Sequence, residues 1–103
     1  MRGWVGVILV GLAACGGSTD VDAILALEGD VGSGKIIYTS RCSLCHGEQG
    51  EGGTTIPLQG SVLPRDEIVS IILAGTTDMQ GFRDILSDQE VADLLAHLED
   101  GIL

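Results

Sequence analysis

The chain has 103 residues and a formal net charge of −10, so it has room for one domain and is strongly acidic. This charge argues against binding to nucleic acid, whose phosphates need clusters of Lys and Arg, and against docking on an anionic membrane surface. A partner protein that carries a basic patch would complement it better.

The first residues have the pattern of an export signal. Arg2 precedes an uncharged apolar run over residues 4–14, which is too short to span a bilayer, since spanning needs about 20 residues. The run ends in Leu12-Ala13-Ala14-Cys15, which resembles the lipobox of bacterial lipoproteins. That resemblance implies cleavage before Cys15 and attachment of lipid to it, and Gly16 favours the outer membrane. An ordinary cleavable signal is the alternative.

The sequence therefore predicts three parts. Residues 1–14 form the signal peptide, and residues 15–28 form a lipid anchor with a short flexible tether, because the stretch after Cys15 is rich in small polar residues. Residues 29–103 form the folded domain. We expect an exported protein that faces the periplasm or the outside of the cell and is held at a membrane through the lipid on Cys15.

Three helices are predicted and no segment alternates like a strand, so the expected fold class is all-α. The first spans 30–41 with Asp30 as its cap, and the second spans 64–73 with Pro64 in its first turn. The third opens at the capping box Ser87-Asp88-Gln89-Glu90 and runs to about Glu99. A glycine-rich loop over 47–60 and a second loop over 76–86 connect these helices.

The stretch Cys42-Ser43-Leu44-Cys45-His46 matches the Cys-x-x-Cys-His pattern of haem attachment. Two thiols at this spacing can add across the two vinyl groups of a porphyrin, and the next residue then lies under the iron, so that His46 can ligate it. The chain has three cysteines. A haem on Cys42 and Cys45 with a lipid on Cys15 uses all of them and leaves no free thiol.

Other motifs compete for these residues and for the stretch before them. A redox disulfide between Cys42 and Cys45 would be expected beside a βαβ pattern, which is not visible. A zinc site could count Cys42, Cys45, His46 and His97 as ligands, but their spacing matches no familiar zinc motif. Residues 29–35 fit the start of a phosphate-binding P-loop, yet Ile36 stands where that motif requires Ser or Thr.

With these motifs in place, residues 29–98 are similar to bacterial class I single-haem cytochromes c. The resemblance implies three main helices wrapped around one covalently attached haem c. In that family a glycine and an aromatic residue of the first helix pack against the last helix, and Gly34 and Tyr38 match them. The first loop of the family supplies a proline carbonyl to the other nitrogen of the ligating histidine, and Pro57 is the matching residue here.

The second loop, residues 75–82, resembles the stretch that carries the family's axial methionine. Met79 is the matching residue, with Phe82 also at the cofactor, although Gln80 replaces the proline that usually follows the methionine. Met79 is also the only methionine that remains after the predicted processing. His97, the other histidine, is predicted on the apolar face of the last helix, where a packing role is expected.

These observations predict an electron-transfer protein, not an enzyme, with His46 and Met79 as the iron ligands and redox proteins as partners. Two alternatives stay open. The chain could be a permanent haem subunit of a membrane oxidoreductase complex, or a haem protein with an open iron that binds gas or peroxide.

Overall fold

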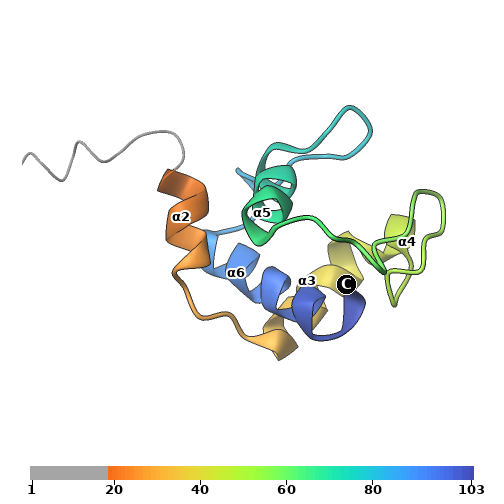
Figure 1. The fold of residues 1–103 in the computed structure, drawn as a ribbon, viewed down its shortest axis with the longest axis horizontal. Coiled ribbons are helices and arrows are strands. Elements are labelled where there is room, and N and C mark those ends of the chain that lie inside the picture. Colours follow the sequence, from red (N-terminus) through yellow and green to blue (C-terminus); the bar gives the residue numbers. More distant parts are fainter. Residues whose placement is uncertain (1–18) are drawn as a thin grey trace, which may run out of the picture.

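The computed structural model describes residues 19–103, so the predicted signal peptide and Cys15 lie outside the described residues. Within that range the chain is helical and contains no strand, which confirms the all-α fold class. Figure 1 shows how the elements are arranged. They are α2 (Thr19–Leu25), α3 (Val31–Arg41), α4 (Ser43–His46), α5 (Arg65–Ala74), α6 (Asp88–His97) and a terminal π-helical turn, η1 (Leu98–Ile102).

The three main helices begin within about a residue of the positions that the sequence predicts. The Asp30 carboxylate accepts a hydrogen bond from the Ser33 backbone N–H at 2.7 Å, and this bond satisfies a donor in the first turn of α3. Ser87 and Glu90 form the reciprocal capping box of α6. Pro64 is the N-cap of α5, where its missing N–H costs nothing.

Helices α3 and α6 form the main packing interface, and small residues allow their close approach. A Cβ atom added at Gly34 would lie 1.9 Å from the Asp93 carbonyl oxygen, and one at Gly29 would lie 2.2 Å from that of Ala92. The Asp30 backbone N–H also donates to the Asp93 carboxylate at 2.8 Å. The glycines of the P-loop-like stretch therefore include two that serve helix packing.

Helix α2 overlaps residues 16–22, which the sequence predicts as a flexible tether, and the apolar residues that follow them. Residues 19–25 form a helix that packs on α5 and α6, with Ile24 only 1% exposed. Asp20 forms an ion pair with Arg83 on the loop after α5. Burial of an apolar side chain stabilises this short helix, which its local sequence would not form alone.

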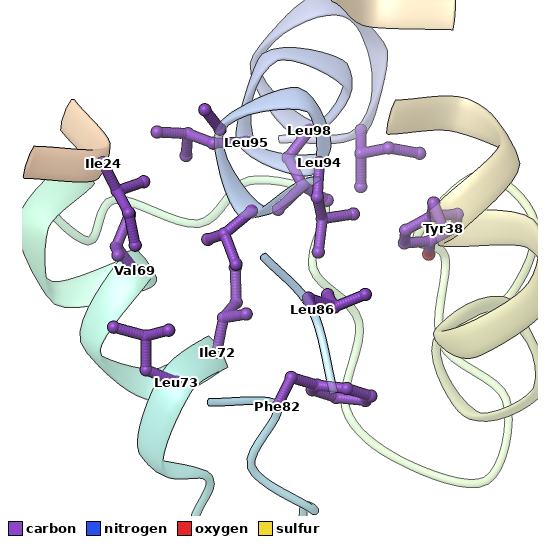
Figure 2. Packing of buried hydrophobic residues seen from close by; sticks show 13 residues of the cluster. Ile24, Tyr38, Val69, Ile72, Leu73, Phe82, Leu86, Leu94, Leu95 and Leu98 are labelled. Carbon is purple, nitrogen blue, oxygen red and sulfur yellow. The ribbon is translucent and has the colours of Figure 1, made fainter. Parts of the chain in front are cut away.

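The core lies between α5, α6 and the loop that joins them, and α2 and α3 cover it from two sides. Figure 2 shows Ile72, Leu94 and Leu98 directed into the same interior region, with Ile24 beside Val69 at one side and Tyr38 at the other. Phe82 and Leu86 cover this region from the loop before α6. Among residues 19–103, no helix is long and apolar enough to cross a membrane.

Candidate cofactor site

A hollow of about 100 Å³, open to solvent, lies between α3, α4, α5 and α6. The wall of the hollow is apolar, and every part of the domain except α2 contributes to it. The residues that line it are Tyr38, Cys42, His46, Leu58, Ser61, Leu63, Ile68, Ile71, Ile72, Met79, Leu94, Leu98 and Leu103. An apolar wall of this kind suits a large apolar ligand.

The Cys-x-x-Cys-His stretch lies at one side of this hollow, where α3 passes directly into α4. The Cys42 N–H donates to the Tyr38 carbonyl at 2.8 Å, and the His46 N–H donates to the Cys42 carbonyl at 3.0 Å. This single helical turn places residues four apart on one face, so Cys42 and His46 both line the hollow. Cys45 is exposed and does not line it.

The environment of the Cys42 thiol is apolar. Burial raises its pKa to about 11, with a smaller rise from Cys45 and an opposing effect of Arg41. The side chain is therefore neutral at physiological pH and resembles a small apolar residue. Cys42 and Cys45 are both free thiols in the structure, not joined in the disulfide that a redox Cys-x-x-Cys would form.

The backbone of His46 is hydrogen-bonded, whereas one ring nitrogen of its side chain has no hydrogen-bond partner. The His46 carbonyl accepts a hydrogen bond from the Gly52 N–H at 2.7 Å, which draws the glycine-rich loop onto α4. Nδ1 of His46 is buried and has no hydrogen-bond partner. Pro57 is exposed and does not bond to it here, because the loop closes on its own backbone. The bond from the Pro57 carbonyl stays a prediction for the haem-bound protein.

Met79 reaches the same hollow from the second loop, far from His46 in the sequence. Thr76 holds this loop: its hydroxyl accepts from the Met79 N–H at 3.1 Å, and its own N–H donates to the Met79 carbonyl at 2.9 Å. Gly75, with φ of 75°, lets the chain turn so closely that a Cβ there would lie 2.4 Å from that carbonyl. Thr76 was not among the predicted site residues, although a threonine that opens a tight turn is a recognisable signal.

The two hydrogen bonds between Thr76 and Met79 matter because Gln80 stands where the family usually has a proline after the methionine. Thr76 is hydrogen-bonded to both the N–H and the carbonyl of Met79, so the backbone of the methionine is held although Gln80 follows it.

Phe82 occupies a different place from the one that the resemblance implies. It is 6% exposed and belongs to the core, its N–H donates to the Ile72 carbonyl at 2.9 Å, and it does not line the hollow.

His97 lies where a packing role predicts it. Its ring is 5.5 Å from that of Tyr38 and tilted against it, in the interface between α3 and α6. It does not line the hollow. Within residues 19–103, no three or more His, Cys, Asp or Glu side chains are grouped so that they could hold a metal ion.

Comparison with known proteins agrees with this arrangement. Residues 29–98 match the family model described as cytochrome C oxidase, cbb3-type, subunit III. The chain is also 35% identical over 82 residues to a cytochrome c-553-like protein of Synechocystis sp., an alignment that covers 77% of this chain and 76% of the relative. No solved structure matches it. The chain belongs to the cytochrome c family, whose members bind haem c covalently and typically carry electrons.

Proposed function

We propose that this chain carries single electrons on one haem c, attached through Cys42 and Cys45 and ligated by His46 and Met79. The observation that supports this most directly is that Cys42 and His46, from one helical turn, and Met79, from a distant loop, line one apolar hollow. The donor set also fits the group, since an imidazole and a thioether are ligands that haem iron takes in cytochromes c.

Each residue has a separate task. The thiols of Cys42 and Cys45 would each add S–H across a vinyl group of the porphyrin, an addition in which no atom leaves, and would hold it covalently. The imidazole of His46 and the thioether of Met79 would ligate the iron. The apolar wall, which includes Leu94 and Leu98, excludes water. When bound, the haem supplies an iron that alternates between the ferric and ferrous states.

The decisive experiment replaces Met79. A thioether bound to ferric iron gives a weak absorption band near the red end of the visible spectrum, and Met79→Ala should abolish this band and lower the reduction potential, because a soft sulfur donor favours ferrous iron. His97→Ala is the control and should keep the band. If His97→Ala removes the band and Met79→Ala does not, the ligand assignment is wrong. Binding of carbon monoxide to the unmodified ferrous protein would instead indicate an open iron.

Covalent attachment has its own test. Haem should stay with the polypeptide through denaturing electrophoresis, because a thioether survives denaturation. Cys45→Ala should leave at most one thioether, which the spectrum of the ferrous pyridine complex reports as one unsaturated vinyl group. Complete extraction of haem from the unmodified protein by acidified organic solvent would contradict attachment through Cys42 and Cys45.

A second function is favoured by the family match. The matching model describes subunit III of an oxidase, so the chain could be a permanent haem subunit that relays electrons within a membrane complex. Its acidic charge suits a partner with a basic patch in either case. Purification from native membranes in mild detergent separates the two: a second chain in constant ratio supports a subunit, and a single chain supports a free carrier.

We also propose that the protein is exported and held at a membrane, the outer membrane being favoured, through lipid on Cys15. The support is the sequence Leu12-Ala13-Ala14-Cys15, which lies outside the described residues. The native protein should partition into detergent. Cys15→Ser should release it from membranes or block its processing, and unchanged fractionation of Cys15→Ser with membranes would contradict the lipid anchor.

A further inference from the structure

Tyr38 contributes more to the site than an apolar ring. It is the only tyrosine of the chain, is 1% exposed and lines the hollow together with Cys42 and His46. Its hydroxyl donates a hydrogen bond to the Gly47 carbonyl at 2.6 Å. A phenylalanine would satisfy the packing between α3 and α6 equally well, so the hydroxyl calls for a separate explanation.

The acceptor of this bond is the residue that directly follows His46. Gly47 ends α4 with φ of 87°, a conformation that releases the chain from the helix. Its carbonyl also accepts from the Gly50 N–H at 3.1 Å, and the His46 carbonyl accepts from the Gly52 N–H at 2.7 Å. The two peptide groups after the histidine are therefore held from two directions, by the loop and by the first helix.

No other side chain of the described residues donates to either of these carbonyls. The loop bonds are backbone bonds of a short, largely exposed segment, and such bonds open easily. The bond from Tyr38 is different, because it starts from a ring fixed in the packed interface against His97 and ends in a partly buried region. It connects the position of His46 to the rigid α3–α6 pair.

We propose that the Tyr38 hydroxyl is a positioning group for His46: it fixes the Gly47 peptide to α3 and thereby sets the orientation of the imidazole toward the iron. This inference depends on the proposed role of His46 as a haem ligand. It assigns to the first helix a direct influence on the ligand, in addition to its packing against the last helix.

The test uses the holoprotein with Tyr38→Phe, which keeps the ring and removes one oxygen atom. The matched control is Val91→Ala, which disturbs a buried residue of α6 that does not line the hollow. Two quantities are measured: the hyperfine-shifted ring proton signals of His46 in the ferric protein, and amide hydrogen exchange at Gly50 and Gly52. The first reports the orientation of the imidazole and the second the opening of the loop.

With Tyr38→Phe, the His46 signals should shift and exchange at Gly50 and Gly52 should become roughly tenfold faster, as expected when a partly buried hydrogen bond is lost. Val91→Ala should leave the His46 signals in place. The proposal is overturned if Tyr38→Phe leaves both quantities unchanged, or if the control shifts the His46 signals equally. Failure of the proposed function is seen separately, as a wild-type protein without covalent haem or without a His46 signal at the iron.

Discussion

Substitution of Gly34 by alanine tests whether the α3–α6 interface depends on contact between backbones. Gly34 is buried, and an added Cβ would lie 1.9 Å from the Asp93 carbonyl oxygen and 2.9 Å from Cβ of His97. The nearest atom belongs to the backbone of the facing helix, so rotation of a side chain cannot relieve the clash. The helices would have to separate by roughly 1.5 Å to reach ordinary contact, and a close-packed interior resists this.

The expected cost follows from two opposing effects. Alanine in place of glycine favours a helix by about 1 kcal/mol. Overpacking of a core costs about 1–3 kcal/mol and sometimes more, and the clash with backbone places Gly34→Ala at or above the upper end of that range. We expect a net loss of at least about 2 kcal/mol in the free energy of unfolding, which for a domain of this size lowers Tm by about 8 °C or more.

Gly32 of the same helix provides the matched control. A Cβ there would meet only the Asp30 carboxylate, at 3.5 Å, so Gly32→Ala should be neutral or stabilising by up to about 1 kcal/mol. Both variants are unfolded in denaturant with haem absorbance and circular dichroism as probes. Equal stability of Gly34→Ala and Gly32→Ala would refute the argument that close backbone approach limits position 34.

Three further predictions concern other parts of the fold. Ser87→Ala should cost about 1 kcal/mol of stability through loss of the α6 cap, measured by denaturation, whereas Glu90→Gln should cost less because glutamine can complete the same capping box. Burial, with a smaller effect of Lys35 and an opposing one of Asp100, lowers the pKa of His97 below 6.5. Below pH 6.5 the unfolded state therefore binds more protons than the folded state, and stability should fall as the pH drops through 6.5. His97→Phe should remove this part of the pH dependence of stability. Identical stability–pH profiles of the unmodified protein and His97→Phe would contradict the prediction. Burial raises the pKa of Tyr38 above 10, with a smaller rise from Glu51 and an opposing effect of the Gly50 backbone, so the single ¹³C-labelled tyrosine signal should titrate only above pH 10 and stability should decline as the pH rises past this value.

The parts of the fold that the sequence predicts correctly are those with local signals. The Asp30 cap, Pro64 and the capping box at Ser87 each identify a helix start within a few residues, because the groups that form the cap are neighbours in the chain. The haem attachment stretch is likewise defined by the spacing of Cys42, Cys45 and His46 alone.

The features that the sequence does not predict depend on contacts between distant segments. Helix α2 is stabilised by the burial of Ile24 against α5 and α6, and the short apolar patch 23–27 does not by itself indicate a helix. The support of Met79 by Thr76 depends on a loop conformation, and the placement of Phe82 in the core depends on its backbone bond to Ile72. The π-helical continuation of α6 over 98–102 was likewise not expected.

The packing of α2 has a practical consequence for anyone who shortens this protein. The region shared with the cytochrome c family model starts at residue 29, and a fragment cut there would lack Ile24. The side chain of Val69, which lies beside Ile24 in the core, would then face water. Newly uncovered apolar surface of this kind promotes self-association, so such a fragment should aggregate during purification, while one that begins at Thr19 should stay dispersed.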